Sequence, residues 1–337
     1  MRIKKLCAAI AAVVIAVSAV TVTAFAAGTR VPINEKYFPD EIFRDYVKQF
    51  DTDGNGSLSQ KERDAVTEID VGFPDDDKII KSLVGVGYFQ NLENLDCSGN
   101  ELIKLNVSKN TNLKELCCES NRLTSLNLSK NTKLEYLDCF DNKITRLNVS
   151  KNTKLKELYC GNNYMTKLDT SKNTQLKRFA CYINELTSLD VSKNTKLEYL
   201  DCCSNKLESL DISRNTGLEY LDCFDNKLTE LDTSKNKKLE NLCCNMNKLT
   251  RLDLSKNKML KTLSCSYNEI AEIDVSKNTE LLSFDCTSNK LTSLDTRKNA
   301  KLEWLWCDGN EITSLNINKN TKLNDYSDHA DDEVVVQ

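Results

Sequence analysis

The chain has 337 residues, a formal net charge of -4 and a single histidine. A mildly acidic chain is a poor general partner for nucleic acid. The one histidine, His329, lies in a polar stretch near the C-terminus, which argues against catalysis that depends on histidine.

The N-terminal segment has the layout of a secretory signal peptide. Basic residues within 2–5 precede the apolar run 6–22, and AFA at 24–26 offers a small-x-small cleavage site. A signal anchor is the alternative, but no second apolar stretch reaches the roughly 18 residues that a spanning helix needs. We therefore expect removal of 1–26 and a secreted protein without a transmembrane segment, and we leave its association with the cell surface open.

The segment DTDGNGSLSQKE at 51–62 has the spacing of an EF-hand calcium loop. The stretches 39–50 and 60–67 on either side are expected to be short helices. The predicted oxygen ligands are Asp51, Asp53, Asn55, Ser57 through its carbonyl, Ser59 directly or through water, and Glu62. The sequence thus predicts an EF-hand-like helical cap at 31–67 with a structural calcium ion. A metal-free helix–turn–helix is one alternative, and a dockerin, which would need a second loop, is another.

A 21-residue repeat occupies residues 92–322. Cysteine returns every 21 positions from Cys97 to Cys307, and an asparagine follows each of these cysteines by three places. The eleven units read L-x-x-L-x-C-x-x-N-x-L-x-x-L-[DN]-x-S-K-N-T-x, with Phe179 and Phe284 at the fourth place. Self-similarity at a fixed period of this length indicates a solenoid.

One unit explains why neighbouring units must stack. Leu95 and Cys97 alternate with polar residues, which is the period of a half-buried strand. Leu102, Leu105 and Val107 then bring the chain back across the core. A single coil leaves its apolar side uncovered, so neighbouring strands should form one parallel sheet with about 4.8 Å between strands.

These units carry a family resemblance. L-x-x-L-x-[LC]-x-x-N is the leucine-rich-repeat signature, and 21-residue units with cysteine in the third apolar place resemble the cysteine-ladder repeats of bacterial internalin-type surface proteins. The resemblance implies an α/β solenoid: a curved, right-handed leucine-rich-repeat coil with a parallel β-sheet on its concave face and a small helical cap. It also implies adhesion to a host or cell surface. The cap of that family has lost metal binding, whereas the ligand set is intact here.

Both ends of a solenoid need covers that hide the core. Residues 68–91 are expected to form an irregular first coil between the cap and the repeats. Residues 323–337 are expected to form a C-terminal cap, because the register fails at Asp328, where a cysteine would be due. The terminal DEVVVQ can supply a closing strand.

The repeat cysteines are predicted to form a reduced packing ladder. An exported chain with 15 cysteines is usually a disulfide scaffold. Ladder side chains on parallel strands, however, stay about 4.8 Å apart, beyond the roughly 3.5–4.5 Å between Cβ atoms that a disulfide needs. The absence of a C-x-x-C spacing argues against a metal or redox role. Cys117, Cys203 and Cys243 are placed on the outward side of their strands, and their role is left open.

Outward strand positions carry many aromatic residues. An exposed aromatic surface on the concave face would mark an interaction site, although cross-strand pairs can also simply stabilise a sheet. Asp138, Asp201 and Asp222 lie between the rings and are predicted to orient a ligand as hydrogen-bond acceptors. The predicted ligand-contacting residues are Tyr136, Phe140, Tyr159, Tyr182, Tyr199, Tyr220, Phe224, Trp304 and Trp306.

A basic row provides the alternative binding surface. Its members stand one per unit, and neighbours should lie about 5 Å apart. Such a row suits an anionic polymer such as teichoic acid or a sulfated glycan, or it is a solvated face partly balanced by the aspartates from Asp169 to Asp253. The row consists of Lys109, Lys130, Lys151, Lys172, Lys193, Arg214, Lys235, Lys256, Lys277, Lys298 and Lys319.

Catalytic motifs are missing from the sequence: there is no Gly-rich phosphate loop, nucleophile elbow or zinc motif. We therefore expect a monomeric, non-catalytic recognition or adhesion protein. Its expected partner is an extracellular or host-surface protein or glycan rather than nucleic acid.

Overall fold

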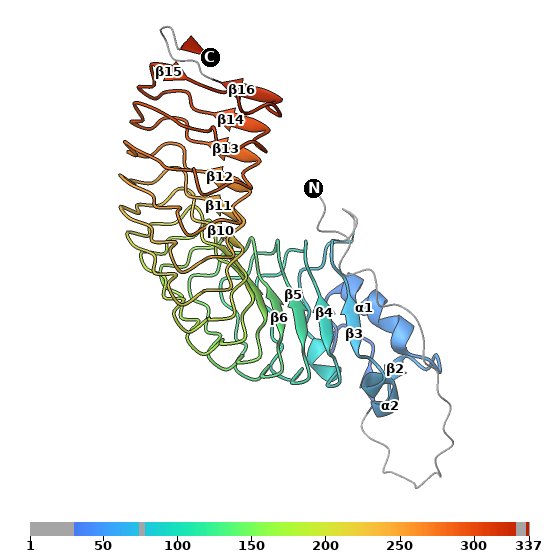
Figure 1. Ribbon diagram of the computed structural model, residues 1–337. Helices are drawn as coiled ribbons and strands as arrows, with labels where there is room; N and C mark the ends of the chain where they lie inside the picture. Colours follow the sequence, from blue (N-terminus) through green and yellow to red (C-terminus); the bar gives the residue numbers. More distant parts are fainter. Residues whose placement is uncertain (1–29, 74–77, 328–334, 337) are drawn as a thin grey trace, which may run out of the picture.

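The computed structural model describes residues 30–73, 78–327 and 335–336, so the predicted signal peptide at 1–26 lies outside the described residues. The chain forms a curved solenoid with a small helical cap at its N-terminal end (Figure 1). In the described part, no helix is long and apolar enough to cross a membrane. The predicted solenoid class with a parallel sheet is confirmed.

The cap is built around the predicted loop. Strand β1 pairs antiparallel with β2, so the chain before the first helix is fastened to the loop itself. Both helices are shorter than the sequence predicted. The first continues as a 3-10 turn after Val47, and the second ends at Asp64, before the chain enters the sheet. The cap elements are β1 (Val31–Pro32), α1 (Glu41–Val47), the 3-10 turn η1 (Lys48–Phe50), β2 (Ser57–Leu58) and α2 (Gln60–Asp64).

A thirteen-stranded parallel sheet lines the inner side of the curve (Figure 1). The eleven units supply β4 to β14, while β3 and β16 add one strand at either end of the sheet. The strands are β3 (Glu68–Asp70), β4 (Asn94–Asp96), β5 (Glu115–Cys117), β6 (Tyr136–Asp138), β7 (Glu157–Tyr159), β8 (Arg178–Ala180), β9 (Tyr199–Asp201), β10 (Tyr220–Asp222), β11 (Asn241–Cys243), β12 (Thr262–Ser264), β13 (Ser283–Asp285), β14 (Trp304–Trp306) and β16 (Asp325–Ser327).

The remaining elements lie at the two ends of the solenoid. The 3-10 turn η2 (Val86–Tyr88) lies within the irregular first coil. Strand β15 (Ser314–Leu315) pairs parallel with β17 (Val335–Val336), so the C-terminal residues do include a short strand. It pairs outside the main sheet. Asp328, where the cysteine register fails, lies outside the described residues.

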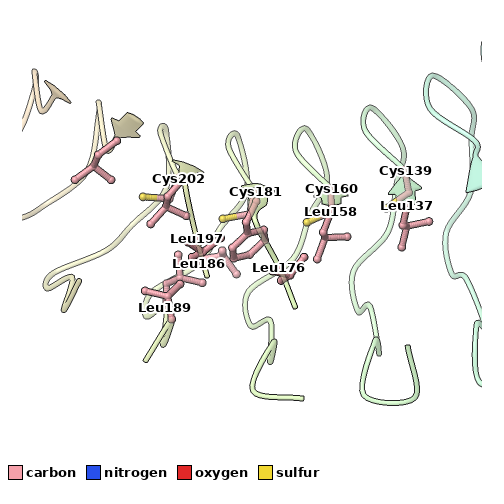
Figure 2. Close-up of a cluster of buried hydrophobic side chains, with 14 of the residues drawn as sticks. Leu137, Cys139, Leu158, Cys160, Leu176, Cys181, Leu186, Leu189, Leu197 and Cys202 are labelled. Carbon is pink, nitrogen blue, oxygen red and sulfur yellow. The ribbon is translucent and has the colours of Figure 1, made fainter. Parts of the chain in front are cut away.

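The cysteine ladder runs through the interior. Figure 2 shows the sulfur atoms of Cys160, Cys181 and Cys202 in successive coils beside the leucines of the core. Every described cysteine is a free thiol, and those at the 21-residue spacing are buried. The expected reduced ladder is therefore what the structure contains.

Two asparagine rows join each coil to the one before it. Asn121 accepts a hydrogen bond from the backbone N–H of Leu102 (2.9 Å) and donates to the carbonyl of Cys97 (2.9 Å), one coil earlier. In the second row, Asn131 donates to the carbonyls of Val107 and Asn110 at 3.0 and 2.9 Å. Because these groups are buried, the amides satisfy backbone carbonyls that water cannot reach.

Candidate functional site

The predicted aromatic residues lie on the concave sheet but do not form one surface. Seven of them lie on or directly after β6 to β10, and we call these the ring patch: Tyr136, Phe140, Tyr159, Tyr182, Tyr199, Tyr220 and Phe224. Trp304 and Trp306 lie on β14, four strands beyond β10. At about 4.8 Å per strand, roughly 19 Å separates the tryptophan pair from the ring patch.

Six of the seven rings of the patch pack in pairs. Tyr199 and Tyr220 stack with 4.5 Å between ring centroids and 10° between planes. The ring centroids of Tyr136 and Tyr159 are 5.7 Å apart, and those of Phe140 and Tyr182 are 5.4 Å apart; the planes of both pairs are tilted.

Because of this packing, the predicted aromatic surface is only partly exposed. Every ring of the patch is half-buried, and of the nine predicted residues only Trp304, with 37% of its surface exposed, counts as exposed. For six of the seven rings, contact with a ring one or two coils away removes part of the ring from water, which sequence position alone does not show.

The predicted acceptors lie among the rings. Asp138 accepts from the backbone N–H of Phe140 (2.9 Å), and Asp201 accepts from that of Cys203 (3.1 Å). Burial raises the pKa of Asp138 to about 7 and that of Asp201 to about 6. The carboxyl group of Glu119 interacts with that of Asp138, and burial raises the pKa of Glu119 as well. The sequence did not single out Glu119. The floor of the patch can therefore change its charge near neutral pH.

Three large exposed residues that follow β8, β11 and β12, which we call the rim, were not predicted. The residue two places after each cysteine from Cys97 to Cys307 has a positive φ, and most units place Gly, Ser, Asp or Asn there. Ile183 (φ 49°), Met246 and Tyr267 occupy the same position with 47%, 44% and 54% of their surface exposed. A branched side chain is disfavoured in this left-handed region. The signal was present in the sequence as three large apolar residues in a column of small polar ones.

The three outward thiols lie on the concave side, as predicted, and are half-buried. Burial raises the pKa of Cys243 to about 12 and raises the pKa of Cys203 as well. Cys203 and Cys243 therefore carry little thiolate at neutral pH, which makes these two thiols poor nucleophiles.

The basic row is exposed along its whole length, from Lys109 to Lys319. Other lysines form ion pairs between adjacent coils, as in Lys156–Glu135 (2.6 Å), whereas no member of the row forms an ion pair with a described residue. The neighbouring aspartates accept hydrogen bonds within their own turns instead, as Asp169 does from the N–H of Ser171 (2.8 Å). The aspartates expected to balance the charge of the basic row therefore do not form ion pairs with its members.

The predicted calcium loop gathers its carboxylates. Oxygens of Asp51, Asp53 and Glu62 lie within 4.8 Å of one another. Asp51 accepts from the backbone N–H groups of Asn55 (3.2 Å) and Gly56 (2.7 Å), and Gly56 has the positive φ (77°) that this sharp turn requires. Hard oxygen donors at one point are what calcium prefers, so the donor set fits.

The same carboxylates already have partners in the chain. Arg30 forms an ion pair with Asp53 (3.0 Å). Glu62 accepts from the N–H groups of Thr52 and Ser59, each at 2.8 Å, and the hydrogen bonds from Ser59 and Thr52 lower the pKa of Glu62 to about 2. Glu62 thus stays ionised and closes the loop by capping α2.

Comparison with known proteins agrees with this architecture. A family model for leucine-rich repeats (two copies) matches residues 132–173, and no curated protein matches the sequence. The functional domain of InlJ from Listeria monocytogenes, which includes a cysteine ladder, shares 34% identity over 88% of this chain and 75% of its own, with a TM-score of 0.67.

Two further solved structures share the fold. The internalin InlF from Listeria monocytogenes is 22% identical, with coverage of 90% of this chain and 98% of its own and a TM-score of 0.76. The leucine-rich-repeat ectodomain of the receptor kinase GASSHO1/SCHENGEN3 from Arabidopsis thaliana, in complex with Casparian strip integrity factor 2, is 23% identical, with coverage of 73% and 33% and a TM-score of 0.66. The solenoid defines a leucine-rich-repeat protein. Given the likeness to InlJ and the shared ladder, the chain belongs to the internalin-like leucine-rich-repeat proteins.

Proposed function

We propose that this protein is a secreted, non-catalytic recognition or adhesion protein that binds a protein or a glycan through its ring patch. The observation that carries the proposal is the set of half-buried rings along β6 to β10, six of which pack in pairs with 4.5, 5.7 and 5.4 Å between ring centroids. Ile183, directly after Tyr182, adds an exposed apolar side chain. Rings that are already held in place lose little entropy on binding.

The chemistry of the patch suits both partner classes. Tyrosine provides a large apolar face and a hydroxyl, and such residues dominate protein interfaces. Arg178 covers Tyr199, with its guanidinium carbon 4.4 Å from the ring centroid, and adds a charged donor. Further support comes from the plant receptor ectodomain, whose structure is a complex with Casparian strip integrity factor 2. A non-catalytic role is supported by the regular use of polar side chains to join coils and close turns.

The test is a binding screen followed by substitution. The mature protein is screened on glycan and host-protein arrays with and without calcium, and hits are measured with a variant carrying Tyr136→Ala, Tyr199→Ala and Tyr220→Ala. Loss of binding is expected, while Tyr164→Ala, which removes an exposed tyrosine outside the patch, should bind normally. Unchanged binding of the triple variant would place the site elsewhere.

A second candidate ligand is an anionic polymer bound along the basic row. It is favoured by one observation: the row is exposed, and none of its members forms an ion pair with a described residue. Reversing four adjacent charges (Lys130→Glu, Lys151→Glu, Lys172→Glu and Lys193→Glu) should abolish retention on heparin or teichoic acid, and salt should weaken retention of the unchanged protein. Retention that survives this reversal contradicts the candidate.

We also propose that calcium stabilises the cap through Asp51, Asp53, Asn55, Ser57, Ser59 and Glu62. The ion would have to displace Arg30 from Asp53 and weaken the hydrogen bonds of Glu62, so we expect a modest affinity of about 10⁻⁴–10⁻³ M, as in extracellular modules. Calorimetry should detect binding that Arg30→Ala strengthens and Glu62→Gln abolishes. No heat at millimolar calcium in either the unchanged protein or Arg30→Ala would refute the site.

A further inference from the structure

A groove with a volume of about 540 Å³ lies where the cap meets the first coil. Its size falls in the range of small-molecule sites. The buried side chains of Leu83 and Val86 line it together with the rings of Tyr37 and Tyr88. The groove is separate from the ring patch, since none of its lining residues lies on a strand of the sheet.

The shape of the groove is fixed by the packing of the cap. Tyr88 makes edge contacts with Tyr37 and with the fully buried Phe38, at 6.0 and 5.9 Å between centroids. Gly85 has φ 107°, and a Cβ atom there would collide with the ring of Phe38. The tyrosine rings are therefore held in place by the core. Tyr88 provides a fixed wall, and the ammonium of Lys36 lies over the ring of Tyr37, 5.2 Å from its centroid.

The charge of the groove is of one sign. Lys36, Lys104 and Lys109 line it, and no carboxylate does. None of the three lysines forms an ion pair with a described residue, although Lys81 nearby is 3.9 Å from Glu101. The side-chain amide of Asn106, also in the lining, keeps its Nδ2 without a partner among the described residues, while its Oδ1 accepts from Ser108 (3.1 Å).

We propose that this groove binds one acidic sugar unit, carrying a carboxylate or a sulfate, independently of the ring patch. Tyrosine faces suit the apolar face of a sugar ring, the amide suits its hydroxyls, and three lysines without counterions suit one acidic group. The site goes beyond the proposed recognition function. It shares Lys109 with the basic row, but a single sugar unit is too short to span that row.

The test measures binding of three probes by ligand-observed NMR: glucuronic acid methyl glycoside, a sulfated glucosamine and neutral methyl glucoside. Saturable binding of either acidic probe, weakened by salt, is expected, and the neutral sugar should bind at least about tenfold more weakly. Binding of the carboxylated or of the sulfated probe alone supports the site and identifies its acid. Equal binding of the neutral sugar, or no saturable binding of any probe, overturns it.

Matched variants locate the probe. Val84 lines the groove and Ile103 does not, yet both side chains are 58% exposed. Val84→Glu should weaken binding of the acidic probe about tenfold or more by placing a like charge at the mouth, and Ile103→Glu should leave it unchanged. The ring-patch variant should also bind the probe normally, which separates this site from the proposed function. Equal effects of Val84→Glu and Ile103→Glu would overturn the assignment.

Discussion

The ring of Tyr199 stacks on that of Tyr220 across adjacent strands, with centroids 4.5 Å apart and planes 10° from parallel. The two residues are direct partners in the register of β9 and β10. Because the repeat period places equivalent residues side by side, any aromatic residue that recurs at 21-residue spacing must meet its copy. The concave face is thereby organised before any ligand arrives.

Replacement of Ile183, which has a strained backbone, should stabilise the protein and weaken ligand binding. Ile183→Asn should raise the free energy of unfolding by about 1 kcal/mol, because asparagine tolerates the left-handed backbone that isoleucine does not. Urea unfolding measures the gain, and binding to a ring-patch ligand should weaken. The reverse change at an equivalent exposed position, Asp225→Ile (φ 52°), should lower stability by a similar amount. A loss of stability in Ile183→Asn would contradict the strain.

Stability should fall as the pH rises from about 4 to 7. In the folded protein the pKa values of Asp138 and Asp201 are raised, to about 7 and about 6, so the folded state binds protons more tightly than the unfolded state. The stabilisation is complete below the ordinary pKa of an aspartate and is lost as the pH passes through the raised values.

Asp138→Asn should flatten this dependence in denaturant unfolding measured across that range. Asp253→Asn is the control, because hydrogen bonds from Ser255 lower the pKa of Asp253 and its titration lies below this window. If Asp138→Asn leaves the pH dependence of the free energy of unfolding unchanged, groups other than Asp138 cause it and the prediction is wrong.

The buried asparagine row should be essential for stacking. Asn152 donates to the carbonyls of Leu128 (3.1 Å) and Asn131 (2.9 Å) in the previous coil. Asn152→Ala should lower the free energy of unfolding by about 2 kcal/mol, since two buried hydrogen bonds are lost. Asn112→Ala removes two exposed hydrogen bonds, one donated to the carbonyl of Gln90 and one accepted from Lys133, and should change the free energy of unfolding by less than about 0.5 kcal/mol. Equal effects of the two substitutions would show that burial is not the reason.

Thiol labelling should separate the ladder from the outward cysteines. In the native protein a maleimide should reach at most Cys117, Cys203 and Cys243, and slowly, because burial raises the pKa of Cys203 and Cys243. In denaturant all thiols should react, as counted by mass spectrometry. Fast native labelling of Cys160 or Cys181, or a quantitative disulfide between ladder positions, would be incompatible with a closed, reduced core.

The sequence was enough to predict the cysteine, asparagine and basic rows, because a fixed repeat period places residues that are distant in the chain on adjacent coils. It placed Cys97, Asn121 and the basic row correctly, since each depends only on position within the unit. The calcium loop is similar: its spacing alone predicted that Asp51 and Glu62 would converge.

Features that depend on contacts between coils were harder to predict. The burial of Tyr199 arises from stacking on its neighbour, and the raised pKa of Asp138 depends on burial and on Glu119 one coil away. The strain at Ile183 depends on a positive φ, which only the column of small polar residues at this position could have indicated. The cap groove joins segments far apart in the chain that share no period, such as 36–37 and 104–109.

Radical footprinting of the tyrosines, with and without a ligand found in the array screen, tests the ring patch as the binding surface most directly. The account predicts that ligand lowers the oxidation of Tyr136, Tyr199 and Tyr220 and leaves the exposed Tyr164 unchanged. Undiminished oxidation of these three tyrosines at saturating ligand would contradict it.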